Sequence, residues 1–163
     1  MSHPTYEQLV DLPAFVEQRV PMPFEDINGH LNVRHYTGLA SEGLKESLVS
    51  VGIPLMWPTQ GHACFSAEHH STYLHELHTG DDMSARVRLL GRSERAGHAL
   101  VYILDHTHER VAFVMEEIFL HIEMESRRTA PWPEDVAKAL DERIAEHEGL
   151  GFAADTRGCL SLR

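Results

Sequence analysis

The sequence has few cysteines and no long apolar run. Its two cysteines, Cys64 and Cys159, are too few for a disulfide framework, so we expect a protein of the reducing cytoplasm. No apolar run approaches the roughly 20 residues that a membrane-spanning helix needs. The N-terminus also has no basic region followed by an apolar segment, so no signal peptide and no membrane contact are predicted.

Positive charge is scarce as well. The chain of 163 residues has 14 Lys and Arg against 25 Asp and Glu, a formal net charge of −11. Because nucleic-acid binding needs a basic surface, the composition argues against it, and any anionic ligand must be met by a local cluster of Arg or Lys. No repeat, low-complexity tract or linker divides the chain, so we expect one domain over residues 1–163.

The spacing of apolar residues predicts one long helix. They recur every three to four residues from Val33 to about Val51, and Gly52 and Pro54 supply a usual helix stop. Gly38 and Gly43 inside this segment are unfavourable for a helix, so we expect both to be compensated by close packing against a sheet.

The remaining segments are mostly strand-like and indicate an α+β architecture with an antiparallel sheet. A charged, amphipathic helix is expected at about 133–147, outside a core at about 15–133, and the residues after 149 are expected to be loose. The expected strands lie at 15–20, 63–76, 83–90, 98–106 and 109–123.

A turn rich in Asn and Gly precedes the long helix. Asn28 and Gly29 favour a tight turn, and Asn32 is a good N-cap for the helix. Asp26 would then lie near a helix N-terminus, where free N–H groups such as that of Val33 can hold a developing negative charge. Taken alone, however, the pattern Asp-x-Asn-Gly is most often only a turn.

The longer string, Asp-x-Asn-Gly-His-x-Asn-x-x-x-Tyr, resembles a family signature. Hotdog-fold acyl-CoA thioesterases of the 4-hydroxybenzoyl-CoA thioesterase type read Asp-x-Asp-x-x-Gly-His-Val-Asn-Asn-x-x-Tyr here, and Asp26 falls on their catalytic acid. Phe24 replaces the first Asp of the family pattern, and Val33 replaces the second Asn. The matching residues are Gly29, His30, Asn32 and Tyr36.

This resemblance covers roughly residues 18–133 and implies a hotdog fold, with the sheet wrapped around the long helix. The later segments Gly80-Asp81 and Arg-Thr-Ala-Pro-x-Pro from Arg128 to Pro133 also look like those of betainyl-CoA thioesterases that are fused to, or found beside, carnitine dehydrogenases.

The resemblance implies hydrolysis of an acyl-CoA thioester. Asp26 would act as the nucleophile or as a general base for water, and the backbone N–H of Val33 would stabilise the oxyanion. His30 would orient Asp26, contact the acyl group or make a structural hydrogen bond. Asn32 would cap the helix or touch the substrate, and Tyr36 would contact the substrate or pack in the core.

Hotdog sites usually lie between two subunits, so a homodimer or a dimer of dimers is expected. Trp57, Phe65 and Tyr73 are candidates for an aromatic cage around a quaternary ammonium, with ordinary packing as the alternative. Glu68 would line a partner's pocket. The candidates for the CoA phosphates are Arg92, Arg95, Arg127 and Arg128.

Thirteen histidines raise the question of a metal. Neither His-Glu-x-x-His nor Cys-x-x-Cys occurs, so we expect no metal and no cofactor, although His106 and His108 share one face of a strand. Two alternatives to the thioesterase remain: a hotdog dehydratase or hydratase, and a non-catalytic acyl-CoA-binding homologue.

Overall fold

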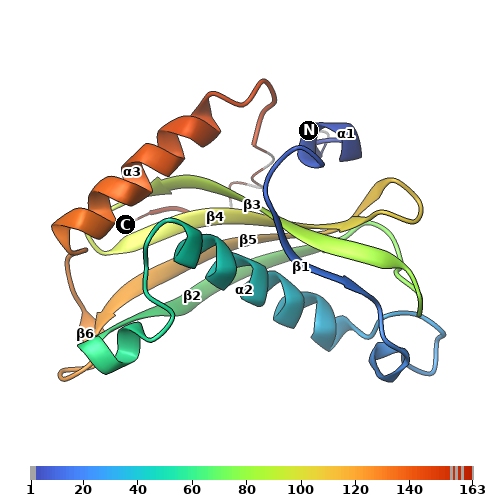
Figure 1. The fold of residues 1–163 in the computed structure, drawn as a ribbon, viewed down its shortest axis with the longest axis horizontal. Helices are drawn as coiled ribbons and strands as arrows, with labels where there is room; N and C mark the ends of the chain where they lie inside the picture. The colour runs from blue at the N-terminus through green and yellow to red at the C-terminus, as the bar shows by residue number, and fades with distance from the viewer. Residues whose placement is uncertain (1–2, 155, 157, 159, 163) are drawn as a thin grey trace.

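The computed structural model describes residues 3–154, 156, 158 and 160–162. A curled antiparallel sheet in the order β1-β3-β4-β5-β2 has the long helix α2 across one face (Figure 1). The elements are α1 (Tyr6–Leu9), β1 (Ala14–Arg19), η1 (Met22–Phe24), α2 (Val33–Ser50), η2 (Trp57–Gln60), β2 (His62–Tyr73), β3 (Asp82–Arg92), β4 (Ala96–Asp105), β5 (Arg110–Glu123), β6 (Arg128–Thr129) and α3 (Glu134–Glu148), where η marks a 3-10 helix. The predicted α+β arrangement of strands and helices is confirmed, whereas η1, η2 and β6 were not predicted.

Helix α2 packs closely against the sheet at Gly43. A Cβ atom placed there would lie 2.5 Å from the Cβ of Ala85 on β3, so only glycine fits without a shift of the backbone. Gly38 has no atom within 4 Å of the same position. The expectation of close packing is therefore confirmed for Gly43 and wrong for Gly38.

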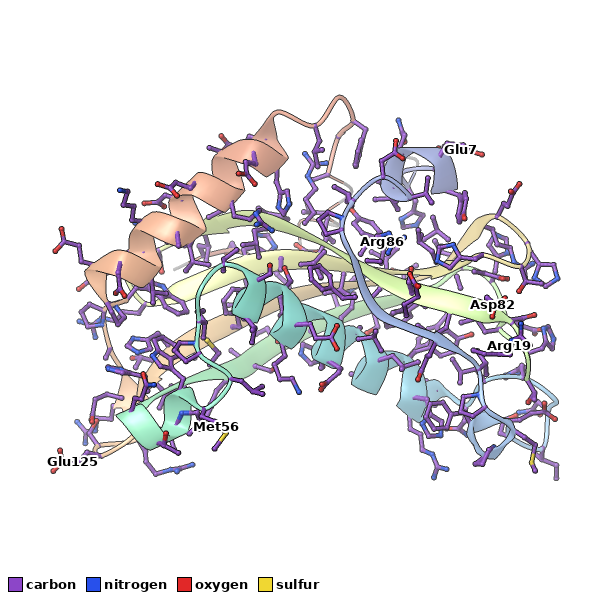
Figure 2. The ribbon with its side chains drawn as sticks, viewed as in Figure 1. Glu7, Arg19, Met56, Asp82, Arg86 and Glu125 are labelled. Carbon is purple, nitrogen blue, oxygen red and sulfur yellow. The ribbon has the colours of Figure 1, made fainter. Side chains whose placement is uncertain are left out.

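Strand β1 covers only the first half of β3. It pairs with residues 82–86, where Arg19 Nε donates to Asp82 Oδ1 at 3.0 Å (Figure 2). Helix α3 packs along the second half, and the Leu89 N–H donates to Nδ1 of His147 at 2.8 Å. Helix α3 therefore covers the part of β3 that β1 leaves unpaired.

The segment after Gly149 is not loose where the structure describes it. The backbone oxygen of Phe152 accepts a hydrogen bond from Nη1 of Arg88 at 2.9 Å, and the guanidinium lies 4.9 Å from the centre of the Phe152 ring. Arg88 faces away from α2, and this contact accounts for its burial on the outer side of the sheet. The expectation was wrong because a cation–π contact of this kind has no local sequence pattern.

Strand β2 forms the other edge of the sheet. Among the described residues it pairs with β5 and with no further strand, and Phe65 and Tyr73 are exposed along it. The predicted strand 63–76 ends at Tyr73 because the chain then turns toward α2, where the Leu31 N–H donates to the Leu77 oxygen at 2.7 Å. No helix among the described residues is long and apolar enough to cross a membrane.

Candidate active site

Asp26 lies in the turn between η1 and α2, and both of its carboxylate oxygens accept hydrogen bonds. Oδ1 accepts from the Asn28 N–H at 2.8 Å and Oδ2 from Nδ2 of Asn32 at 3.2 Å. The turn is closed by the Gly29 N–H, which donates to the backbone oxygen of Asp26 at 3.0 Å. Gly29 has φ +80°, a backbone conformation that favours glycine. The Asp26 side chain is 18% exposed, so it is held in place but open to solvent.

Asn32 caps α2, as predicted from the sequence. Its Oδ1 accepts from the Arg34 N–H at 3.1 Å, while its backbone is extended. Among the described residues the N–H of Val33 has no acceptor, as is usual in the first turn of a helix. The positive end of the helix dipole therefore lies beside Asp26, and a negatively charged oxygen can be held there.

His30 lies at the edge of this turn. Its Nδ1 is 4.0 Å from Oδ1 of Asp26 and 3.2 Å from the backbone oxygen of Leu31. The first distance is too long for a direct hydrogen bond to the carboxylate. His30 is therefore placed next to Asp26 but is bonded to the backbone.

The hydroxyl of Tyr36 is used inside the fold. It accepts from the Leu77 N–H at 3.0 Å and donates to the His75 oxygen at 3.4 Å, and burial raises the pKa of this side chain. Tyr36 also lines a cavity of about 290 Å³ at the start of α2, together with Val33 and Tyr73. Tyr36 thus shapes this cavity while its hydroxyl is already satisfied.

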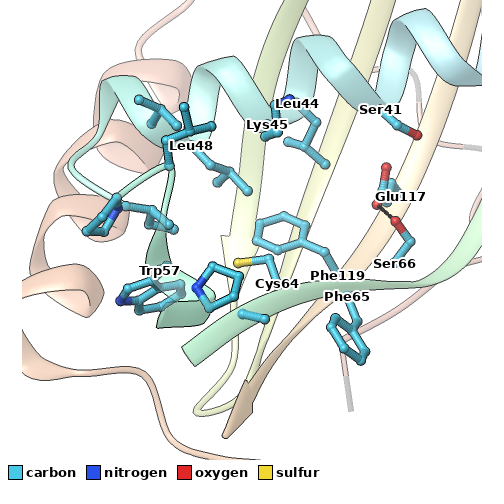
Figure 3. Close-up of a pocket in the computed structure, with 16 residues that line it drawn as sticks. Ser41, Leu44, Lys45, Leu48, Trp57, Cys64, Phe65, Ser66, Glu117 and Phe119 are labelled. Atoms are coloured by element: carbon cyan, nitrogen blue, oxygen red, sulfur yellow. Dashed lines mark hydrogen bonds between the residues drawn. The ribbon is translucent and has the colours of Figure 1, made fainter. Parts of the chain in front are cut away.

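A second cavity, of about 320 Å³, lies at the other end of α2, against η2 and the start of β2 (Figure 3). Trp57 and Phe65 line it, together with the buried carboxylate of Glu117. Cys64 also lines it, but burial raises the pKa of its thiol to about 12, so it is not a thiolate nucleophile.

The predicted aromatic cage does not assemble within one chain. Trp57 and Phe65 line the second cavity, whereas Tyr73 lines the first. Phe65 and Tyr73 are eight residues apart on β2, a span of about 26 Å at the usual rise of a strand. Glu68 lies between them on the exposed edge.

The four candidate arginines lie at the same end as the second cavity. Arg92 is bonded to Asp141 of α3, with Nε–Oδ1 at 2.7 Å. Arg95 is exposed in the β3–β4 turn, and the guanidinium of Arg127 lies 5.6 Å from the centre of the Phe65 ring. Arg128 is exposed on β6. Within one chain, all four lie at the opposite end of the sheet from Asp26 (Figure 1).

His106 and His108 lie in the turn after β4, not on a strand as expected, and they do not form a shared site. His106 bonds to Tyr6 and Ser84, whereas Nδ1 of His108 lies 2.8 Å from Oδ2 of Asp105. Asp81 joins Asp105 and His108 in a group whose ligand atoms lie within 4.8 Å of one another. The carboxylate of Asp105 is already bonded to His108 and Arg110, so hydrogen bonds within the fold explain why these three residues lie close together.

A model of the thioesterase-like superfamily matches residues 20–140. The chain belongs to this superfamily.

A curated superfamily relative, the L-carnitine dehydrogenase/betainyl-CoA thioesterase of Agrobacterium fabrum (strain C58), is 28% identical over 124 residues, which cover 76% of this chain and 25% of the relative. The betainyl-CoA thioesterase of Pseudomonas aeruginosa is 26% identical over 147 residues, covering 90% of this chain and 86% of the relative. This chain therefore spans about a quarter of the first relative and most of the second.

Solved structures share the fold of this chain. A hypothetical protein from Staphylococcus aureus, solved in complex with CoA, superimposes with a TM-score of 0.76 at 21% identity, covering 88% of this chain and 97% of that chain. With the family match, this similarity confirms the predicted hotdog fold.

The prediction from sequence missed Glu117 and the cavity that it lines. The signal was available, because Glu116 and Glu117 interrupt the apolar run from Val111 to Leu120 on β5. Two adjacent carboxylates in such a strand must point to opposite faces, so one of them had to face α2.

Proposed function

We propose that the protein hydrolyses acyl-CoA thioesters, with Asp26 as the nucleophile or as the general base for water. One observation carries this proposal: two hydrogen bonds fix the Asp26 carboxylate near the start of α2, where the N–H of Val33 has no acceptor among the described residues. A carboxylate next to an oxyanion-binding N–H is what either route to thioester cleavage needs. The superfamily and the thioesterase names of the relatives agree with it.

In the nucleophilic route, an Asp26 oxygen attacks the thioester carbonyl carbon, the C–S bond breaks, and CoA leaves as a thiolate. Water then opens the mixed anhydride and restores the carboxylate. In the general-base route, Asp26 takes a proton from the water that attacks the carbonyl, and the C–S bond of the resulting intermediate then breaks, so that CoA leaves as a thiolate. In both routes the carbonyl oxygen becomes negative, and the Val33 N–H stabilises it.

We further propose that the active unit is at least a homodimer, formed through the free edge of β2. Two identical edges that pair around a twofold axis run antiparallel, so the Tyr73 end of one copy meets the Phe65 end of the other. Asp26 of one copy would then face the second cavity and the arginines of its partner. This arrangement would bring the four candidate arginines of one copy to the end of the sheet where Asp26 of the other copy lies.

The test is release of free thiol from a panel of CoA thioesters with short, aromatic, long-chain and betainyl acyl groups. We expect Asp26→Asn to lower kcat by at least ~100-fold, the usual range for a lost acid–base group. Glu25→Gln is the matched control, because the neighbouring carboxylate accepts from the Thr79 hydroxyl instead. If folded wild-type protein releases thiol from no member of the panel, the proposed hydrolysis is wrong. Equal activity of Asp26→Asn and wild type would exclude the role of Asp26.

A further inference from the structure

Two histidines form a hydrogen-bonded pair where β2 begins. His62 is the first residue of β2, and its Nδ1 lies 3.0 Å from Nε2 of His121 on β5. Nδ1 of His121 lies 2.9 Å from the backbone oxygen of Ala130. The ring of Trp57 on η2 is centred 5.2 Å from the His62 ring and 5.1 Å from the His121 ring, and Trp132 stacks on His121 at 5.2 Å. Hydrogen bonds and aromatic contacts therefore fix the orientation of the pair.

The hydrogen bonds also assign the proton positions of both rings. A carbonyl oxygen only accepts, so Nδ1 of His121 carries a hydrogen and donates to Ala130. His121 is 1% exposed and burial lowers its pKa, so the ring is neutral and its Nε2 has a lone pair. Nδ1 of His62 must donate to this lone pair. In the neutral ring of His62, Nε2 is therefore the basic nitrogen.

Nε2 of His62 is available for chemistry. It has no hydrogen-bond partner among the described residues, and His62 is only half-buried. The titratable groups that face the ring, His121 and Glu123, both lie on β5. The carboxylate of Glu123 accepts from the N–H groups of Glu125 and Ser126 at 2.9 and 2.7 Å. An imidazole with a fixed tautomer and an open Nε2 can act as a general base toward water.

The proposed pairing of β2 edges would bring this imidazole to the Asp26 end of the other copy. Strand β2 ends at Tyr73, which lines the first cavity together with Val33 at the start of α2. When two such edges pair antiparallel, the first residues of one strand lie beside the last residues of the other. Cys64, two residues after His62, lines the second cavity against α2, so the His62 side chain also points to the α2 side of the sheet. His62 of one copy would then lie on the face, and at the end of β2, where α2 of the other copy begins.

We propose that His62 of one copy is the base that activates water at Asp26 of the other. This inference rests on the proposed hydrolysis and on its nucleophilic route. Once Asp26 is acylated it cannot serve as a base, so this route needs a second group to activate water. Nε2 of His62 takes a proton from the water as its oxygen attacks the acyl carbon. The bond from the acyl carbon to the Asp26 oxygen then breaks, which releases the carboxylic acid and restores the Asp26 carboxylate, and the proton passes from His62 to solvent.

His62→Asn separates this chemistry from the packing of the pair. The amide nitrogen of Asn can replace Nδ1 as the donor to His121, but nothing in Asn replaces Nε2. On the thioester that wild type hydrolyses fastest, His62→Asn should release about one CoA per site in a burst and then turn over at least ~100-fold more slowly than wild type. The burst should disappear when Asp26→Asn is added. His70→Asn is the matched control and should keep wild-type kcat, because His70 lies opposite Glu116 and points away from α2.

Two outcomes in His62→Asn would overturn the inference. An unchanged kcat would mean that another group activates the water. A slower rate without a burst would mean that the substitution impairs acylation or packing, since either defect also slows the first release of CoA. If wild type itself releases no CoA, the proposed hydrolysis fails, whereas an active wild type with an unaffected His62→Asn refutes only the role of His62.

Heterodimers test whether His62 and Asp26 of one site come from different copies. A dimer with Asp26→Asn in one chain and His62→Asn in the other would keep one intact site and about half of the wild-type rate, since a twofold dimer has two equivalent sites. The control dimer has both substitutions in one chain and a wild-type partner. It would have no intact site, so it should be no faster than the His62→Asn homodimer. Differential tags isolate each heterodimer. An exchange of the two results would overturn the inference, because His62 would then act within its own chain.

Discussion

The side chain of Asn32 joins the helix cap to the carboxylate of Asp26. Oδ1 accepts from the Arg34 N–H at 3.1 Å, while Nδ2 of the same amide donates to Asp26 Oδ2 at 3.2 Å. The two ends of one amide thus start the helix and orient the proposed catalytic group. These two functions can be separated by mutation.

Asn32→Asp should keep the cap and lose the donor to Asp26. Asp is as good an N-cap as Asn, so the free energy of unfolding at pH 7 should change by less than about 1 kcal/mol. The second carboxylate would face Asp26 in place of an N–H, so kcat should fall at least ~10-fold. Asn32→Ala should lose both functions, with about 1 kcal/mol of stability removed. Chemical denaturation and steady-state kinetics on the three proteins test this, and an Asn32→Asp enzyme with wild-type kcat would contradict it.

Val33→Pro should remove the proposed oxyanion donor while preserving the helix. Proline lacks the N–H and is favoured at the first position of a helix. The residue before proline must be extended, and Asn32 already has φ −63° and ψ 138°. We expect kcat to fall about 100- to 1000-fold, as when one oxyanion donor is lost. Val33→Ala keeps the N–H and should retain activity. A fully active, folded Val33→Pro protein would show that this N–H is not the donor.

Much of the fold follows from local patterns, but the assembly of the site does not. The period of α2, the Asn32 cap and the alternation along the strands were readable because each depends on residues a few positions apart. The cavity around Glu117 was missed because β2, β5 and α2 build it together. The contact of Arg88 with Phe152 was missed for the same reason. A linear motif also gives no distances, so the separation of Asp26 from the candidate arginines appears only in three dimensions.

The two glycines of α2 should respond oppositely to alanine. At Gly43 the added methyl group would lie 2.5 Å from the Cβ of Ala85, so Gly43→Ala should force the helix from the sheet and cost about 1–3 kcal/mol of stability. At Gly38 nothing lies within 4 Å, so Gly38→Ala should stabilise the protein by up to about 1 kcal/mol through helix propensity. Urea denaturation of both variants checks this, and a stabilising Gly43→Ala would contradict the close contact.

His147 should make the protein less stable in mild acid. Burial lowers its pKa to about 4 from 6.5, with Arg143 and Arg88 acting in the same direction. Between these values the unfolded chain binds a proton that the folded protein does not, so stability is complete above pH 6.5 and declines as the pH falls toward 4. The loss should approach about 3 kcal/mol. His147→Asn keeps an acceptor for the Leu89 N–H without titrating, so its stability should not share this decline. Parallel pH profiles for the two proteins would exclude His147 as the cause.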